Sequence, residues 1–506
     1  MVNPGRPSRA CATCKQRKIK CDQSQPTCTP CARSGWACPG IPLETDVRFR
    51  NQTDLVARNF RRGNLALHLL RANRPAGTQG WAASPTRAPS SSLADRGTAF
   101  FLRHYVHRLD DESTAAAGGG IHEYIPALLR QEGATESFKT ILAAAGLAAL
   151  VNVGNTAAWR FEAYRLYNNS IRHLKSDLND PVRVKLDHTL VAVMLMGTFE
   201  AIASGDAESM KSFAHHTLAA ALCIEMRGPC QFRTASSVKM FLQMRRIIVQ
   251  TCHQLQEPIP YALRRWSSWV ESLQSEAESA SNRFSEINER LAIARADIKR
   301  KGICSPSAIA TRLLRIDGEL ETWRRDLPAS WVYKSYRDLR STGSLDRGFT
   351  GWYDMYPDLW IASAWNNYRT VRLLIHETII KATIKYGAVD ENPNLDVSMA
   401  VLQTMTRDIC NSVICHLGGP QLHDPTGSQG GISRAIPGGY MLMWPLFLSG
   451  MLRTTPMDQR RWIAAELRKI GVGMGLRLAI SMATLIEEQN KSFSDSEVWL
   501  IGHFFP

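Results

Sequence analysis

Six cysteines near the N-terminus have a spacing that suits metal binding: Cys11, Cys14, Cys21, Cys28, Cys31 and Cys38. The pattern C-x2-C-x6-C therefore occurs twice, offset by 17 residues. Two cysteines that are separated by two residues place both sulfurs on one ion in structural zinc sites. Two tetrahedral ions need eight ligand positions, which six thiolates fill only if two sulfurs bridge both metals. The repeat predicts two zinc ions and indicates Cys11 and Cys28, the first cysteine of each half, as the bridging pair.

A disulfide framework and zinc sites with histidine ligands are the alternatives for this cysteine pattern, and the neighbouring sequence argues against both. The first nine residues lack the apolar core of a secretory signal, which argues against a disulfide framework. The first histidine is His68, so classical fingers and cross-brace sites that use histidine ligands do not fit. The segment also has too few apolar residues for a core. We therefore expect metal binding to supply its folding energy.

Four basic residues lie between the second and third cysteines: Lys15, Arg17, Lys18 and Lys20. Their counterparts 17 residues later are Ala32, Ser34, Gly35 and Ala37, so the two halves share the cysteines and not the charge. The i, i+3 spacing of the basic residues predicts one cationic face if the run is helical. Such a face suits phosphates and the guanine edge in the major groove. A solvated surface is the alternative for any charge run, but here the run lies inside a compact metal module.

The segment from Cys11 to Cys38 closely resembles the DNA-binding domain of fungal binuclear zinc cluster transcription factors. All six cysteines match, as do the run C-x-x-R-K-x-K-C from Cys14 to Cys21 and the loop proline, Pro26. The resemblance implies a module of two short helices with bridging sulfurs at Cys11 and Cys28. It further implies that one helix docks in the major groove over a CGG-type triplet. The family's base-reading lysine corresponds to Lys18, and Arg17 replaces the commoner lysine beside it.

The remaining chain is long enough for a large core. The chain has 506 residues and a net charge of +15, which suits binding to nucleic acid. We place the zinc cluster domain at 8–40 and a flexible linker at 41–97, where Pro, Ser, Ala and Gly are frequent and a short helix is expected near its start. A coiled-coil dimer is weakly supported there, because the heptad series Leu55, Arg62, Leu69 includes a charge.

Residues 98–506 are predicted to form one all-α domain, which makes the fold class mainly α. Apolar runs at 141–151 and 190–196 read as buried helices, because each is shorter than the roughly 20 residues that span a bilayer. No membrane partner is therefore expected. The six scattered cysteines, at 223, 230, 252, 304, 410 and 415, show no metal spacing and are predicted to be reduced core residues. Further helices are predicted at 208–226, 236–253, 282–300, 307–325, 358–386, 395–416 and 458–489.

The long helical part is similar to the regulatory domain that follows the zinc cluster in the same family. The similarity rests on the stretches that begin at His215, Pro258 and Tyr356. These patterns are less specific than the cysteines.

Catalytic signatures are missing from the sequence. His376-Glu377 begins like a zinc-protease motif, but Ile380 stands where the second histidine is needed. Glycines at 471, 473 and 475 give G-x-G-x-G with no preceding strand, which favours close helix packing over dinucleotide binding. The pair His215-His216 reads as an ordinary histidine pair within a helix. A cluster of Trp and Tyr at 323–368 is interpreted as core, with an effector pocket as the alternative; its seven named members are Trp323, Trp331, Trp352, Tyr353, Tyr356, Trp360 and Trp365. We expect that the chain is not an enzyme.

These observations favour a nuclear, sequence-specific DNA-binding regulator of RNA polymerase II transcription. Double-stranded DNA is the expected partner, together with transcription machinery or co-regulators, and a homodimer stays open. Family resemblance makes a metabolic or biosynthetic pathway the expected target. The alternatives are a metabolite-sensing protein or a protein-interaction protein with an accessory zinc module. The C-terminal stretch S-D-S-E-V-W-L-I-G reads as packing of the chain end, with an activation segment as the alternative.

Overall fold

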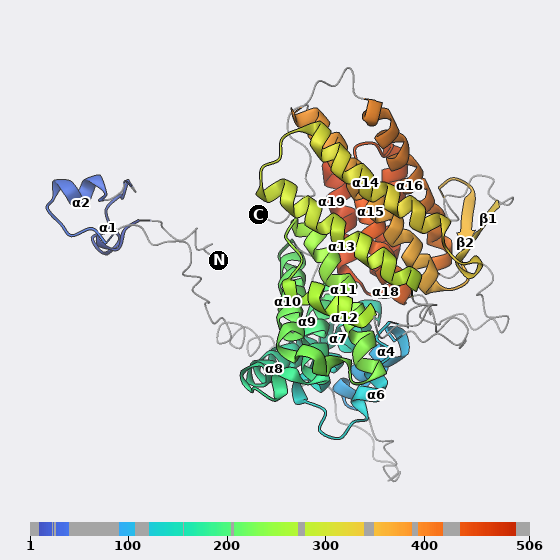
Figure 1. Cartoon of the computed structure of the whole chain (residues 1–506). Helices are drawn as coiled ribbons and strands as arrows, with labels where there is room; N and C mark the ends of the chain where they lie inside the picture. The colour runs from blue at the N-terminus through green and yellow to red at the C-terminus, as the bar shows by residue number, and fades with distance from the viewer. Residues whose placement is uncertain are drawn as a thin grey trace, which may run out of the picture. The chain divides into compact units, whose positions relative to one another are not determined.

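The computed structural model divides the chain into two compact units, residues 1–88 and 89–506. Figure 1 shows both units, and each is described here by itself. The structure describes residues 10–22, 24, 27–39, 91–106, 121–154, 156–203, 207–271, 279–337, 349–386, 393–417 and 436–491. Several predictions lie outside these residues: the linker from 41 to 90 with its short helix and coiled coil, the loop proline Pro26, and the C-terminal stretch.

The first unit contains two short helices, α1 (Ala12–Gln16) and α2 (Thr29–Arg33). The second unit is helical, which confirms the mainly α fold. Its α-helices are α4 (Leu93–His104), α6 (Ile125–Leu129), α7 (Glu136–Gly154), α8 (Arg160–Asn179), α9 (Asp187–Ala203), α10 (Ala207–Arg227), α11 (Ala235–Leu255), α12 (Tyr261–Glu271), α13 (Ser279–Arg300), α14 (Pro306–Arg325), α15 (Leu359–Tyr386), α16 (Pro393–Leu417), α17 (Ile436–Met451), α18 (Met457–Met474) and α19 (Arg477–Lys491). Short 3-10 helices span Ala157–Trp159, Arg183–Lys185, Gly228–Phe232 and Ala329–Trp331.

The helical unit begins before the predicted boundary at Thr98. Helix α4 starts at Leu93 because Ser92 and Asp95 form a capping box. The Ser92 hydroxyl accepts a hydrogen bond from the Asp95 amide at 3.1 Å, and the Ser92 amide donates to the Asp95 carboxylate at 3.2 Å. This reciprocal cap stabilises a helix start that the Ser- and Ala-rich composition obscured. Residues 93–97, assigned to the linker from sequence, therefore lie in a helix.

Helix α7 lies at the centre of the N-terminal part of the unit, packed against α4, α8 and α9. It meets α4 where Gly97 faces Gly146: a Cβ added to Gly97 would clash with the Ala143 carbonyl oxygen, and one added to Gly146 would clash with that of Gly97. The two backbones are therefore in direct contact. Among the described residues, α7 is long and apolar enough to cross a membrane, but 67% of its most apolar window is buried inside the protein. This burial agrees with the predicted core helix.

The C-terminal part differs from the prediction in two places. The single helix expected at 458–489 is two helices, because Gly475 adopts a left-handed conformation (φ 72°) that ends α18. Nearby Gly471 has no room for a side chain against Ile480 of α19, as close packing predicts, whereas Gly473 has open space around it. The second difference is a small antiparallel sheet, β1 (Lys334–Arg337) with β2 (Trp352–Met355), paired in the register Ser335–Asp354.

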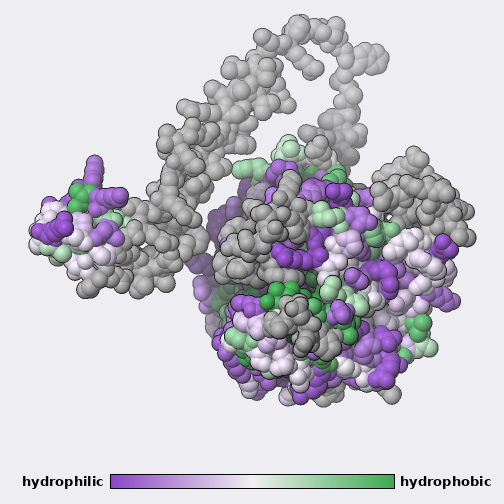
Figure 2. Space-filling view, turned by 90° about the horizontal axis from the view of Figure 1, so that it is seen from above, coloured by the Kyte–Doolittle hydropathy of each residue, from purple (hydrophilic) through white to green (hydrophobic). Residues whose placement is uncertain are grey.

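The core of the helical unit is one continuous apolar cluster from Phe100 to Ile486. The face shown in Figure 2 is largely hydrophilic, with hydrophobic residues in small groups. Of the scattered cysteines, Cys223, Cys252 and Cys410 are buried as predicted. Cys304 is exposed, because it lies in the turn between α13 and α14, so the core assignment was wrong for this residue.

Candidate metal centre and nucleic-acid interface

The two halves of the small unit repeat the same backbone conformation. Helices α1 and α2 each end with an amide that donates to a carbonyl five residues earlier: Ile19 to Cys14 at 3.1 Å, and Trp36 to Cys31 at 3.0 Å. Each end requires a left-handed residue, and these are Lys18 (φ 56°) and Gly35 (φ 65°), which are 17 positions apart. The sequence repeat is thus also a structural repeat, with the helix-ending geometry that usually selects glycine.

The six sulfurs form two groups of four. One group contains the sulfurs of Cys11, Cys14, Cys21 and Cys28, and the other those of Cys11, Cys28, Cys31 and Cys38; within each group all sulfurs lie within 4.8 Å of one another. Cys11 and Cys28 belong to both groups. Their sulfurs are 3.7 Å apart, and the Cys14 and Cys28 sulfurs are 3.6 Å apart. Which sulfurs bridge two metal ions stays a prediction, but the shared pair is the one that the repeat indicates.

These distances fit tetrahedral zinc. Four sulfurs at about 2.3 Å from one tetrahedral ion lie about 3.8 Å from each other. Cys11, Cys14, Cys28 and Cys31 are almost completely buried. Burial raises the pKa of the Cys14 thiol to about 12, with hydrogen bonds from neighbouring cysteines contributing in both directions. Buried sulfurs packed this closely exist as thiolates only beside cations, so the donor set suits metal ions.

Polar contacts hold the two halves together around the sulfurs. The Asp22 carboxylate accepts from the Thr29 amide at 3.1 Å and thereby caps α2 from outside the helix. Hydrogen bonding by the Thr29 hydroxyl lowers the pKa of Asp22 against the opposing effect of burial, and the Ser24 hydroxyl and the Thr29 amide add to this lowering. The Thr13 hydroxyl donates to the Ala37 carbonyl at 2.8 Å. Asp22 is the single acidic residue among residues 1–40, and its position between the two halves of the repeat suits this capping role.

The basic run is arranged differently from the predicted helical face. Helix α1 ends at Gln16, so Lys15 alone lies in the helix, and its side chain is outside the described ones. Arg17 and Lys18 form the turn, Lys20 follows it, and all three are exposed. The helix stops because Lys18 is left-handed. The i, i+3 argument therefore fails, although the four cations remain grouped beside the metal centre.

Arg17 makes a contact that the sequence did not reveal. Its guanidinium carbon lies 4.1 Å from the centroid of the Trp36 ring. Trp36 follows Gly35 at the end of α2, so the stack joins the basic half to the uncharged half. Guanidinium stacking on an aromatic face leaves the N–H edge available for other acceptors.

The motifs set aside in the sequence have structural roles in the described residues. His376 is buried, with Nδ1 3.0 Å from the Ser398 hydroxyl and Nε2 3.3 Å from Asp317. His215 is exposed and His216 half-buried on α10. Five of the seven aromatic residues singled out at 323–368 are buried, namely Trp323, Trp331, Tyr356, Trp360 and Trp365, in agreement with their interpretation as core.

Comparisons with known proteins agree with this geometry. Residues 9–46 match the fungal Zn(2)-Cys(6) binuclear cluster domain, and residues 101–324 match the fungal specific transcription factor domain. The chain is 62% identical over 29 residues to the C6 finger domain transcription factor hasF of Aspergillus fumigatus. That alignment covers 6% of this chain and 4% of the relative. No solved structure matches.

The chain belongs to the family of fungal binuclear zinc cluster transcription factors, which are DNA-binding proteins. The cofactor of its N-terminal domain is a pair of zinc ions, for which the six sulfurs provide two sets of four. Helices α4 to α14 lie within the matched part of the second domain, apart from the first turns of α4 and the last residue of α14.

Proposed function

We propose that residues 8–40 bind double-stranded DNA through a CGG-type triplet in the major groove, and that residues 98–506 regulate or recruit. The observation that carries the proposal is the one-sided charge of a symmetric module. The two halves share cysteines and helix ends, yet Arg17, Lys18 and Lys20 stand exposed in one half while their counterparts are Ser34, Gly35 and Ala37. A purely structural zinc module has no need of this asymmetry.

Lys18 is the residue that we assign to base reading. It is exposed and holds a left-handed conformation where the equivalent position of the repeat is glycine. A non-glycine residue in this region is strained by about 1–2 kcal/mol. Strained residues of this kind concentrate at functional sites, so retention of lysine here supports a role in binding. Lys15 and Lys20 are assigned to phosphates. Arg17 is assigned to the phosphate backbone beside Lys18, with Trp36 holding its guanidinium.

Within the metal centre, we assign Cys11 and Cys28 as the bridging ligands. Cys14 and Cys21 complete one zinc site, and Cys31 and Cys38 complete the other. Cys28→Ala should then lose both zinc ions, whereas Cys14→Ala should leave the second site partly occupied. Elemental analysis of the purified variants gives zinc per chain directly. Equal loss in both variants would contradict the bridging assignment.

The remaining parts of the proposal follow from family membership. We infer a nuclear regulator of RNA polymerase II transcription that controls a metabolic or biosynthetic pathway and acts with co-regulators. We also propose that the protein acts as a homodimer, since the two zinc modules of a dimer would bind two triplets in the same DNA site. The arrangement of the helical unit, a large core with no catalytic motif in the sequence, supports a regulatory role.

Selection of bound sequences from random DNA with the full-length protein tests this proposal. It yields triplet, spacing and symmetry together. Lys18→Ala should then weaken binding to the selected site by about 1–3 kcal/mol and flatten the preference for G·C pairs. Lys20→Ala should weaken all sequences alike and lower the salt slope by about one unit.

Arg33→Ala is the matched control, because Arg33 is an exposed cation at the end of α2. It removes one charge from the same module without touching the basic run, and sequence preference should be unchanged. A preference that follows Arg33, Ser34 or Gly35 instead of Lys18 would place the reading surface on the second half and refute the assignment.

A further inference from the structure

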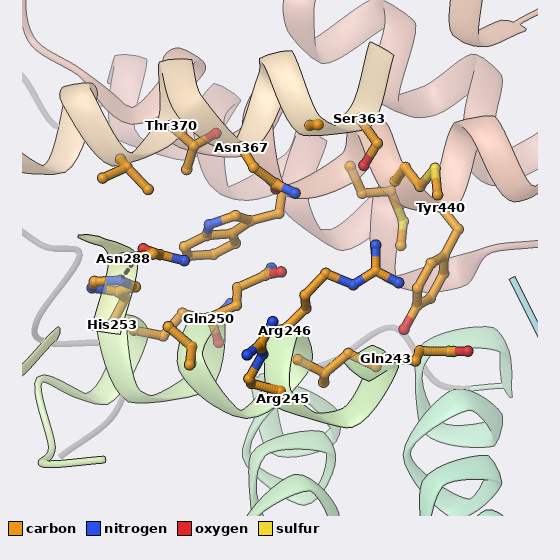
Figure 3. Close-up of a pocket in the computed structure, with 18 of the residues that line it drawn as sticks. Gln243, Arg245, Arg246, Gln250, His253, Asn288, Ser363, Asn367, Thr370 and Tyr440 are labelled. Atoms are coloured by element: carbon orange, nitrogen blue, oxygen red, sulfur yellow. Dashed lines mark hydrogen bonds between the residues drawn. The ribbon is translucent and has the colours of Figure 1, made fainter. Parts of the chain in front are cut away.

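A cavity of about 180 Å³ lies inside the helical unit. Most of its wall comes from α11, α13, α15 and α17, with single residues from α9 and α10 and two from α19, so it joins helices that are far apart in the sequence. Figure 3 shows Gln243, Arg246 and Gln250 rising from α11 toward Asn367 and Thr370 on α15, with Tyr440 of α17 facing the same space. Arg245, His253, Asn288 and Ser363 add further polar groups to the wall, and its apolar part includes Phe284, Trp360, Met443, Trp444 and Met482.

Arg246 is the charged group that sets the chemistry of this cavity. Its guanidinium carbon lies 4.0 Å from the centroid of the Trp360 ring. Among the residues that the structure describes, no carboxylate pairs with it, and its charged neighbour is another cation, Arg245. Burial, together with repulsion from Arg245, lowers the pKa of Arg246 to about 9. The protein thus keeps a partly buried cation, without a carboxylate partner among the described residues, at the wall of the cavity.

Two other arginines of the unit, both buried, have the carboxylate partner that Arg246 lacks among the described residues. Arg372 forms a two-pronged ion pair with Asp317, at 2.8 and 2.9 Å. Arg369 lies 3.6 Å from Asp354, and both side chains are buried. These two guanidinium groups have carboxylate partners supplied by the fold, as buried charges generally require. At Arg246 no described residue supplies the corresponding anion, which leaves that place open to an anionic ligand.

The stack on Trp360 leaves the guanidinium suited to an anionic ligand. One face of the group is covered by the ring, and its N–H donors point outward in the plane, where a carboxylate can accept two parallel hydrogen bonds. Gln250 and Asn367 add amide groups for further polar atoms. An apolar cavity of roughly 150 Å³ accommodates a benzene ring. The volume here therefore suits a small molecule with one ring or a short chain.

We propose that this cavity binds a small organic carboxylate, whose anionic group pairs with Arg246 and whose apolar body packs against Trp360 and Trp444. The ligand would contact α11 and α13 on one side and α15 and α17 on the other. It would therefore stabilise the packing between the part of the unit that matches the family domain and the part that follows it. This gives the helical unit an effector site, which is independent of whether the zinc module binds DNA.

Titration calorimetry on the full-length, zinc-loaded protein tests the proposal with defined probes. Benzoate, phenylacetate and hexanoate are compared with benzamide, phenylacetamide and hexanamide, which keep the shape and lack the charge. At least one carboxylate should bind saturably and raise the unfolding temperature, with its amide bound about 10–100-fold more weakly. No binding by any of the three carboxylates, or equal binding of acid and amide, would overturn the proposal.

Variants locate the binding to the cavity. Arg246→Met should reduce carboxylate affinity to that of the amide, whereas Arg315→Met, an exposed arginine on α14, should leave it unchanged. Ala364→Phe keeps the arginine but fills the cavity, and it should abolish binding of both probe types. This second variant decides the question if Arg246→Met does not fold. Unchanged affinity in Ala364→Phe would show that the carboxylate binds elsewhere and would sink the proposal.

Discussion

The zinc module and the helical unit fill their interiors with opposite chemistry. In the described part of the module, the buried apolar cluster consists of cysteine sulfurs, with Trp36 packed at its edge. The helical unit buries a continuous set of aliphatic and aromatic side chains and adds charged pairs such as Arg372–Asp317. The first interior depends on an ion that is not encoded in the chain, and the second depends on the chain itself. The two units should therefore fail under different conditions.

Removal of zinc should have the largest effect, and only on the module. Structural zinc contributes on the order of 10–16 kcal/mol in finger peptides, and the described residues of the module form no core besides the cysteine cluster. Chelation of the full-length protein should abolish DNA binding and the dispersion of module signals in NMR spectra. The calorimetric transition of the helical unit should keep its midpoint. A shift of that midpoint on chelation would show that the two units are not energetically separate.

Breaking a buried ion pair should have the next largest effect, and only on the helical unit. Asp317→Asn leaves Arg372 without its two-pronged partner and should destabilise the unit by about 3–5 kcal/mol in urea unfolding. The matched control is Glu319→Gln, which removes the exposed pair with Arg290 (2.6 Å) and should change stability by about 1 kcal/mol or less. Equal effects of the two variants would refute the argument from burial.

Acid should destabilise the helical unit through buried neutral histidines. Burial lowers the pKa of His122 and of His253 to about 3 and that of His416 to about 4. The unfolded chain binds protons from about pH 6.5, so stability is complete above that pH and falls progressively below it. Each histidine adds up to about 1.4 kcal/mol per pH unit. His253→Gln should reduce the pH slope of the unfolding free energy, and an unchanged slope would contradict this assignment.

Replacing Lys18 by glycine should give the smallest change in the free energy of unfolding. This variant separates the contribution of Lys18 to stability from its contribution to DNA sequence preference. Glycine suits the left-handed backbone, so the zinc-loaded module should gain about 1 kcal/mol against unfolding. The same change removes the proposed base-reading side chain, so sequence preference should fall as in Lys18→Ala. The reverse change, Gly35→Ala, has open space around its Cβ but strains the backbone and should destabilise the module.

Sequence patterns predicted the helices whose apolar residues recur regularly over many turns. Helices at α10, α11 and α13–α16 begin and end within three residues of their predicted bounds, because their apolar periodicity is long and regular. The spacing of the cysteines predicted two sets of ligands with a shared pair. The sequence patterns missed helix ends that depend on one or two residues. These are the capping box at Ser92, the left-handed Lys18 that ends α1, and the left-handed Gly475 that separates α18 from α19.

The cavity was beyond reach of the sequence for a different reason. Its walls draw on segments from Ile121 to Met482, so no local pattern contains it. The seven aromatic residues singled out in the sequence suggested a pocket, but Trp360 is the member of that group that lines this cavity. Arg246 carries no sequence signal either, since a charge next to Arg245 on a helix usually lies in solvent. Tertiary packing brings Arg246 and Trp360 together, and this packing cannot be read from the sequence around either residue.

The contact between Gly97 and Gly146 has a mechanical consequence. The chain enters the helical unit through α4, and α4 is held to α7 where two backbones touch without side chains between them. A pulling force on the N-terminal side of the chain would therefore load this contact before the other helix contacts of the unit. Short-range backbone contacts of this kind are stiff and break over a small displacement. We expect the first rupture in a force-extension experiment to release α4 before the remaining helices yield.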